Sequence, residues 1–487
     1  MEQNKSKNYG SALYTLITVF FFWGFVAASN DILIPVFKEK LQLEQWQSQM
    51  ISFAFYVAYT VGSIIYAIIS SGIKGDILNR IGYKNGIALG LVISALGTLL
   101  FYPAAESASF LIMITGLFIV GLGFSLQQIA ANALAIALGD PKTGAQRLSL
   151  AGGVNNVGGT IGPVLVSLAI FGSVNASSSE ASISAVKFPY LILGAAFILV
   201  AVIFKFSSIP DRIEAEAEAE AADVSQFTHN VKKKSALSYQ QLVLGMIAIF
   251  VYVGVEVSTA SNLPEYMLKK LGVATASSAP YVSLYWASLM IGRWTASIAV
   301  FNLTGAFKKM MNVVVPYAAF GLFLLISKLA NHDVTPFYVY GFAIIVLIIA
   351  DLLSKGNPAR QLFIFSALAI VALFIGMTTT SMLSAYALIS VGLFCSTLWP
   401  CIYALAIAGL GKHANQGSGY LIMMIMGGGF ISLLQGFLAD DALLGIQWSY
   451  LVGVACFAYL AFYAIKAKSI LKAQGIDFEE ASVKAAH

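Results

Sequence analysis

Residues 13–37 read LYTLITVFFFWGFVAASNDILIPVF, an almost unbroken apolar run. About 20 residues of α-helix cross the hydrocarbon core of a bilayer, so this run is long enough to span a membrane. It nevertheless contains Asp31, directly after Asn30. A carboxylate at membrane depth is costly and usually faces the interior of a helix bundle. We therefore predict that Asp31 lies on an ion or substrate path; the alternative is a position in water at the outer mouth of the helix.

The composition of the chain indicates a polytopic, all-helical membrane protein. Of its 487 residues, 59% are hydrophobic and 10% are charged, and the mean hydropathy is +0.81. Soluble globular chains carry about 25% charged residues. The first run is longer than a signal-peptide core and is followed by another apolar run, so we expect it to remain as a helix. The net charge of +5 is assigned to cytoplasmic loops, with no nucleic-acid partner.

Apolar runs of membrane length recur along the chain and predict about fourteen spans. A polar segment at 209–238, with alternating Glu and Ala and then three consecutive lysines, is interpreted as a cytoplasmic linker. It separates an N-terminal six-helix bundle, 1–208, from a C-terminal bundle, 239–487, with an inserted helical hairpin at about 310–355. The predicted spans are about 13–37, 49–72, 86–104, 109–138, 148–172, 188–208, 240–262, 279–301, 311–330, 335–353, 361–378, 383–409, 417–438 and 447–466.

Loop charges predict the orientation of these spans. With the start of the chain inside, most loop Lys and Arg residues fall on the cytoplasmic side, as the positive-inside rule requires. Asp333, Asp440 and Asp441 fall on the outer side. Both termini are therefore predicted to be cytoplasmic, and the inserted hairpin, being a pair of spans, preserves that topology.

An internal repeat supports two related halves. The segment Ala133–Ala137 reads ALAIA and recurs at Ala404–Ala408, and Gln146 precedes a Gly-Gly pair by the same interval as Gln416 does. Matches at nearly one offset on both sides of a linker indicate two parallel six-helix halves. The same offset aligns Gln128 in the first half with Trp399 in the second, which makes both candidates for facing a central cavity.

The loop after the second span carries a glycine-rich, basic motif formed by Gly75, Asn79, Arg80, Gly82 and Lys84. It resembles the cytoplasmic loop signature of the major facilitator superfamily, although Asn79 stands where an aspartate is usual. Glycines permit a tight turn there, and the basic side chains can meet helix-end carbonyls. The alternative is an ordinary basic cytoplasmic turn.

Further motifs over most of the chain resemble the fucose–proton symporter family, which includes fucose permease and bacterial glucose/galactose transporters. The resemblance does not extend to the linker or to the inserted hairpin. It implies the major facilitator fold and a sugar transporter. The matching residues are Trp23, Gly24, Asn30, Asp31, Pro35, Ala130, Ala131, Asn132, Arg147, Leu148, Leu150, Ala151, Asn155, Tyr252, Val253, Gly254, Ile291, Gly292, Arg293, Pro400, Gly427, Gly428, Gly429, Gly436 and Asp440.

The resemblance implies roles for three positions. Asp31 matches an aspartate implicated in sugar recognition and coupling. The glutamate implicated in protonation falls on Gln128, which can only exchange hydrogen bonds. Glu256 stands where fucose permease has an amide, so the acid has moved to the other half. Burial and a nearby like charge favour protonation of a carboxylate, so we predict that Asp31 and Glu256 form a cross-domain coupling pair. The alternative for Glu256 is a structural hydrogen bond, for example to Asn262.

Amides and aromatic rings near these acids suit a hydroxyl-rich ligand, because amides exchange hydrogen bonds and rings cover the C–H face of a sugar. Simple packing or interface anchoring is the alternative for each ring, and helix–helix hydrogen bonding for Asn132 and Asn155. The predicted substrate-binding residues are Trp23, Asn30, Gln127, Gln128, Asn132, Asn155, Asn156, Tyr252 and Trp399.

We therefore expect a monosaccharide–cation symporter in a bacterial cytoplasmic membrane, with the proton as first choice of coupling ion and sodium as the alternative. Glucose or galactose is preferred over fucose. A facilitator or a nutrient receptor with structural carboxylates is the other class considered. We expect a monomer in the lipid bilayer with no cofactor and no metal site. No nucleophile–base set or nucleotide motif indicates an enzyme.

Overall fold

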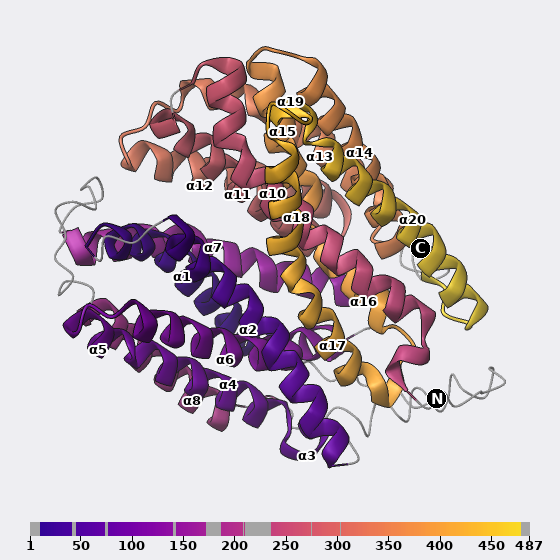
Figure 1. Ribbon diagram of the computed structural model, residues 1–487. Helices are drawn as coiled ribbons and strands as arrows, with labels where there is room; N and C mark the ends of the chain where they lie inside the picture. Colours follow the sequence, from indigo (N-terminus) through magenta and orange to yellow (C-terminus); the bar gives the residue numbers. More distant parts are fainter. Residues whose placement is uncertain are drawn as a thin grey trace. The chain divides into compact units, whose positions relative to one another are not determined.

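The computed structural model describes residues 10–40, 45–73, 76–139, 143–171, 187–207, 209, 235–273, 275–301 and 303–478. Within these ranges all regular secondary structure is helical (Figure 1). Before the linker the elements are α1 (Gly10–Lys40), α2 (Gln45–Gly72), α3 (Ile77–Ile81), α4 (Tyr83–Leu99), α5 (Phe101–Glu106), α6 (Phe110–Ala137), α7 (Gly144–Phe171) and α8 (Lys187–Phe206).

The second part of the chain is divided into more pieces because several of its spans are interrupted. Its elements are η4 (Ala236–Ser238), α10 (Gln240–Leu271), α11 (Thr275–Ser297), η5 (Ile298–Phe301), α12 (Gly305–Leu329), η6 (Thr335–Tyr340), α13 (Gly341–Ser354), α14 (Pro358–Thr378), α15 (Met382–Cys395), α16 (Leu398–Ile407), η7 (Gly411–His413), α17 (Ala414–Met423), η8 (Met424–Met426), α18 (Gly427–Leu438), α19 (Gly445–Trp448) and α20 (Leu451–Ala473).

Each predicted apolar run coincides with one helix or with two or three consecutive helices. Within the described ranges, 11 helical segments are long and apolar enough to cross a membrane. The helices α1, α7 and α11 are not among them. The protein is therefore all-helical with many membrane-length segments, while the number of about fourteen spans and the side on which the termini lie stay predictions.

The chain forms two compact units. Unit 1 holds Met1–Pro141, Val154–Asp223 and Gly411–Met423, and unit 2 holds Lys142–Gly153, Val224–Leu410 and Met424–His487. Each unit thus takes a short segment from the other side of the linker. The domain boundaries predicted along the chain, at 208 and 239, stay a prediction.

In unit 1, α6 packs against α2 and α4, and α4 packs against α8. The later part of α7 approaches α1 so closely that a side chain would not fit between them. A Cβ atom on Gly24 would lie 1.8 Å from the Asn155 carbonyl oxygen, and one on Gly158 would lie 2.1 Å from that of Phe21. Small residues permit such backbone contact between membrane helices. This contact fixes the position of Trp23, the neighbour of Gly24.

In unit 2, α10 is central and packs against α11, α15, α16, α18 and α20. Its core contains tyrosines that are almost fully buried, among them Tyr252, Tyr266 and Tyr285. The predicted span at 383–409 is not one continuous helix, since α15 ends at Cys395 and α16 begins at Leu398. This interruption lies beside the site described below.

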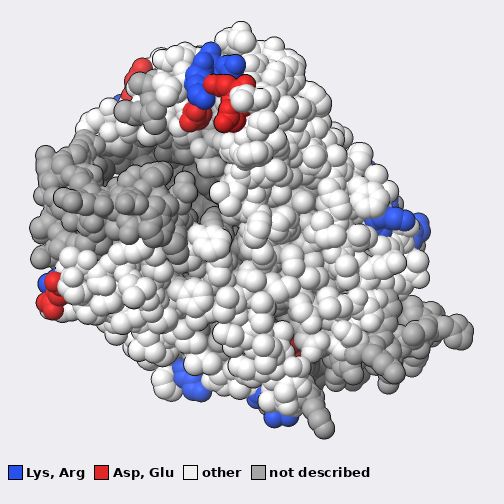
Figure 2. All heavy atoms as spheres, viewed as in Figure 1, with Lys and Arg blue, Asp and Glu red and all other residues white. Residues whose placement is uncertain are grey.

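The predicted hairpin corresponds to α12, η6 and α13, whose outer surface carries exposed apolar side chains such as Leu329 and Phe342. Such a surface is suited to lipid. The hairpin is tied to the bundle by Asp351 on α13, which accepts a 3.0 Å hydrogen bond from Gln361 on α14. Figure 2 shows that the charged side chains on one face form small groups separated by broad uncharged surface.

Candidate functional site

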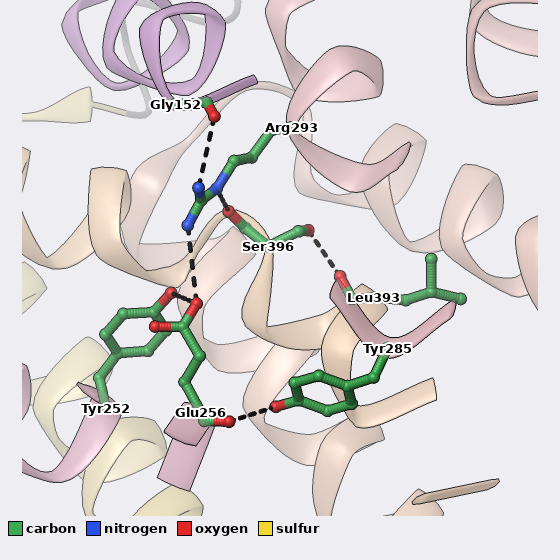
Figure 3. Close-up of polar contacts among 7 residues, drawn as sticks. All are labelled: Gly152, Tyr252, Glu256, Tyr285, Arg293, Leu393 and Ser396. Carbon is green, nitrogen blue, oxygen red and sulfur yellow. Dashed lines mark hydrogen bonds and ion pairs between the residues drawn. The ribbon is translucent and has the colours of Figure 1, made fainter. Parts of the chain in front are cut away.

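Glu256 on α10 carries a carboxylate inside the helical core of unit 2. Its Oε1 lies 3.6 Å from a guanidinium nitrogen of Arg293 on α11, and both side chains are 13% exposed. The same oxygen accepts a 2.8 Å hydrogen bond from the hydroxyl of Tyr252, one helical turn earlier (Figure 3). Residues four apart on a helix share a face, so Tyr252 is placed by the helix itself. Asn262, the alternative partner considered from the sequence, instead donates to the Ser258 carbonyl.

Arg293 also binds a carbonyl group that the fold leaves available. Its Nε donates a 3.1 Å hydrogen bond to the Ser396 carbonyl in the interruption between α15 and α16. In a helix that carbonyl would accept from the N–H four residues later, which is position 400, but proline has no N–H. Pro400 therefore leaves the Ser396 carbonyl without a helical donor. Helical bonding resumes at the next position, where the Cys401 N–H donates to Thr397.

The third acceptor of the Arg293 side chain belongs to α7. A terminal guanidinium nitrogen lies 3.4 Å from the Gly152 carbonyl oxygen, and Gly152 is in the α7 segment assigned to unit 2 (Figure 3). A buried ion pair is costly to assemble, and removing one partner typically costs about 3–5 kcal/mol because the other charge stays buried. The two carbonyl contacts supply part of the solvation that the Arg293 guanidinium loses.

Aromatic rings line the same part of unit 2. The rings of Tyr252 and Trp399 are 6.3 Å apart at a 53° angle, and those of Trp399 and Tyr403 are 6.2 Å apart and stacked. The hydroxyl of Tyr285 donates to the Glu256 backbone carbonyl at 2.8 Å. Three of the predicted site residues, Tyr252, Glu256 and Trp399, are thus neighbours.

Two of the predicted substrate-binding residues in unit 1 bind each other. The Trp23 indole N–H donates to Gln127 Oε1 at 2.8 Å, and Gln127 Nε2 donates to the Ser94 hydroxyl at 2.9 Å. Trp23 is 5% exposed and Gln127 is fully buried. Both ends of the Gln127 amide are therefore engaged, and a ligand would have to replace one of these bonds to reach it.

The other amides of unit 1 lie on α6 and α7. Gln128 Nε2 donates to the Tyr59 hydroxyl at 3.0 Å, and Asn155 Nδ2 donates to the Phe20 carbonyl at 2.9 Å, so Asn155 joins α7 to α1. Asn132 is 2% exposed and its Nδ2 has no hydrogen-bond partner within the described protein atoms. Asn156 is half-buried, and its backbone carbonyl accepts from the Thr160 hydroxyl. Asn132 is therefore the amide with the clearest unused donor.

Three predicted site residues lie partly or wholly outside the described part of the structure. The backbone of Asn30 and Asp31 belongs to α1, but their side chains are outside the described part of the structure. Gly75 lies outside the described residues altogether. The predicted pairing of Asp31 with Glu256 thus stays a prediction.

The remaining loop residues form an ordered turn in unit 1. Gly82 separates α3 from α4 with a φ of +85°, a conformation that favours glycine. Asn79 Oδ1 accepts a 2.7 Å hydrogen bond from Asn415 on α17, whose own Oδ1 accepts from the Tyr83 hydroxyl. Arg80 donates to the Ile73 carbonyl and Lys84 to the Ser207 carbonyl. Both basic side chains of this turn thus donate to backbone carbonyls.

Asp76, which sequence reasoning did not select, is the acid of this turn. It caps α3 by accepting from the Leu78 N–H at 2.9 Å, and both of its oxygens lie 2.7 Å from the Tyr66 hydroxyl. The side chain is 5% exposed. Burial raises the pKa of the Asp76 carboxyl above its usual value, and the hydrogen bonds from Tyr66 and Leu78 partly offset this shift.

Arg293 is not among the site residues predicted from the sequence, although it belongs to one of the matching motifs. A signal for it was present, because it is a lone charge in the apolar run 279–301, as Asp31 is in the first run. Ser396 and Gly152 gave no comparable signal, since their contribution is a backbone carbonyl. Across the described residues, no group of three or more His, Cys, Asp or Glu side chains is placed to hold a metal ion.

Comparison with known proteins agrees with this architecture. The model of the Major Facilitator Superfamily matches residues 13–350. The chain is 34% identical over 466 residues to a protein of Brucella abortus biovar 1 (strain 9-941) named glucose/galactose transporter, covering 95% of this chain and 96% of the relative. It is 26% identical over 479 residues to the L-fucose-proton symporter of Escherichia coli (strain K12), covering 95% and 94%.

Among solved structures, that of the E. coli fucose:proton symporter FucP is similar in fold, with a TM-score of 0.69 and 24% identity over 95% of this chain and 99% of that one. The matching family is one of transporters and not of enzymes. The chain belongs to the Major Facilitator Superfamily, in the group of relatives that includes bacterial glucose/galactose transporters and fucose–proton symporters.

Proposed function

We propose that the protein takes up a monosaccharide by cation symport across the cytoplasmic membrane of a bacterium. The relatives support the substrate class, because the more similar one is named a glucose/galactose transporter and the more distant one an L-fucose-proton symporter. A hexose of the glucose or galactose type is preferred over fucose for this reason, and because Gln128 on α6 stands where the resemblance places a glutamate.

The observation that supports cation coupling is the Glu256–Arg293 pair. A transporter gains from a buried carboxylate if the charge of that group changes during the cycle, since a cation can then alter the balance between conformations. Protonation of Glu256 would remove the negative charge that lies 3.6 Å from the Arg293 guanidinium, and so change the electrostatic balance of the pair. The proton is the first choice of coupling ion, and sodium held by carboxylates is the alternative.

Aromatic groups near Glu256 in unit 2, and separately an amide in unit 1, support a sugar ligand. Trp399 is half-buried and lies beside Tyr252, so part of the indole is available to contact the C–H face of a pyranose. The Nδ2 group of Asn132 in unit 1 can donate a hydrogen bond to a ligand hydroxyl. Asp31 is proposed as the second acid of the coupling system.

We also propose about fourteen spans with both termini cytoplasmic, and a monomer in the lipid bilayer. The eleven membrane-length segments, with α1, α7 and α11 as further long helices, are consistent with that number. Reporter fusions at both termini and in the loop containing Asp333 test the orientation. A periplasmic signal from either terminus would contradict it.

The experiment that tests the function uses purified protein in liposomes. An imposed inward proton gradient, and separately a sodium gradient, should each be tested for accumulation of radiolabelled glucose, galactose and fucose. Accumulation above the external concentration with one gradient, abolished by an ionophore for that ion, is the expected result. If neither gradient produces accumulation while downhill exchange persists, the protein is a facilitator. If no sugar crosses at all, the transport proposal is wrong.

A further inference from the structure

The Arg293 side chain joins three separate elements of unit 2. It pairs with the Glu256 carboxylate on α10, donates to the Ser396 carbonyl between α15 and α16, and lies 3.4 Å from the Gly152 carbonyl on α7 (Figure 3). A guanidinium presents five N–H donors in a planar fork, so one group can serve several acceptors with fixed geometry. An ammonium in the same place would act as a point charge.

Local packing holds the guanidinium against both carbonyl groups. A Cβ atom on Gly292, next to Arg293, would lie 1.9 Å from the Ser396 hydroxyl oxygen, so α11 and the interruption are in direct contact. A Cβ atom on Gly152 would lie 3.2 Å from Arg293 Cδ, so a side chain at that position would crowd the arginine. Pro400 prevents a helical N–H from competing for the Ser396 carbonyl. Three features of the sequence thus favour one arrangement of Arg293.

We propose that Arg293 is a positioning residue that transmits the charge state of Glu256 to the α15–α16 interruption and to the first turns of α7. The inference rests on the proposed function in one respect, because it takes Glu256 as the group whose charge changes during transport. When Glu256 is ionised, the guanidinium is held between the carboxylate and the two carbonyl groups. When Glu256 is neutral, the guanidinium loses the attraction of that carboxylate and is held less firmly, which weakens its contacts with Ser396 and Gly152 together.

Within the described part of the chain, the titratable groups acting on Glu256 or on its partners come from three packed helices. Tyr252 lies on α10, Arg293 and Tyr285 lie on α11, and Cys395 lies on α15; these groups act electrostatically on one another or on Glu256. Tyr252 and Tyr285 contact Glu256 through hydrogen bonds that neutral hydroxyls donate. Arg293 is the cation of this set, so the change in charge acts mainly on its position.

The experiment compares amide hydrogen exchange in the full-length protein, reconstituted in nanodiscs at one fixed pH. E256Q represents the neutral carboxyl group, and the two reporter regions are 393–399 and 148–155. Exchange in both regions should accelerate about tenfold in E256Q, because the charged guanidinium no longer holds the two segments as firmly. In R293K both regions should already exchange fast, and adding E256Q should change nothing further. An equal effect of E256Q in the Arg293 and R293K proteins would overturn the proposal.

P400A is a second variant that leaves both charged residues in place. It restores an N–H that competes with Arg293 for the Ser396 carbonyl, so the E256Q effect on 393–399 should shrink while that on 148–155 persists. G429A on α18 is the matched control, since nothing lies within 4 Å of the added methyl group. No effect of E256Q on either region of the otherwise unchanged protein would also refute the linkage.

Failure of this inference is distinguishable from failure of the proposed function. If the wild-type protein accumulates sugar but the exchange of the two regions does not depend on Arg293, only the linkage is wrong. If exchange in the two regions depends on Arg293 but no gradient produces sugar accumulation, the linkage through Arg293 exists and the proposal of cation coupling is wrong.

Discussion

The indole N–H of Trp23 and the amide oxygen of Gln127 are joined by a 2.8 Å hydrogen bond in the core of unit 1. Replacing Gln127 by Leu keeps a similar volume but leaves the buried Trp23 N–H without an acceptor, whereas the Ser94 hydroxyl still donates to the Val120 carbonyl. The loss should be about 1–3 kcal/mol for the unsatisfied indole N–H, seen as a lower melting temperature. If Gln127 binds sugar instead, KM for sugar rises and the melting temperature hardly moves.

Asp31 is predicted to couple the cation to the sugar. D31N should abolish accumulation driven by the gradient while leaving downhill exchange measurable, because asparagine is nearly isosteric but cannot take up a proton. Uptake into liposomes with and without the gradient measures both quantities. A D31N protein that accumulates sugar as the wild type does would exclude Asp31 from coupling.

Glu256 is predicted to determine the pH or sodium dependence of transport. E256Q should flatten that dependence, because the remaining amide binds neither a proton nor sodium as a carboxylate does. E265Q is a matched control on the same helix, since Glu265 is 53% exposed and pairs with Lys269 on the surface. Uptake rates across a pH series, at fixed sodium and then the reverse, provide the comparison. An unchanged profile would assign Glu256 a structural role.

Gly24 is predicted to be intolerant of any side chain. G24A places a methyl group 1.8 Å from the Asn155 carbonyl oxygen, so α1 and α7 must separate. Overpacking of this kind costs about 1–3 kcal/mol or more, and we expect a lower melting temperature and reduced transport. G72A is the control, because nothing lies within 4 Å of the new methyl group at the end of α2. Equal melting temperatures of the two variants would contradict the close α1–α7 contact.

Asp76 is predicted to make stability depend on pH in a direction unusual for an aspartate. Burial raises its folded-state pKa above the usual 3.8, so folding favours the protonated form. The stability that protonated Asp76 contributes is therefore fully present below the usual pKa of 3.8 and is lost as the pH rises through the folded-state pKa. D76N cannot ionise, so the melting temperature of the wild type relative to D76N should fall as the pH rises above about 4. A difference that rises with pH would show that the hydrogen bonds outweigh burial.

The helices could be predicted from the sequence because the lengths of apolar runs carry that information. The interruption after Cys395 is different, since the run continues through it and Pro400 is its one local signal. Glu256 could be selected because a charge in an apolar run is conspicuous, and Arg293 satisfied the same criterion. Their pairing depends on the register of α10 against α11, which single helices do not encode. The carbonyls of Ser396 and Gly152 belong to the backbone, so no residue type reveals them.

The two compact units have a consequence for dissecting the molecule. Unit 1 includes Gly411–Met423 from beyond the linker, and unit 2 includes Lys142–Gly153 from before it. A fragment ending in the linker therefore lacks part of its own unit, and so does the complementary fragment. Each half expressed alone should be degraded or aggregate, whereas co-expression of both halves should restore assembly. The protein is thus better suited to split-fragment complementation than to isolated-domain studies.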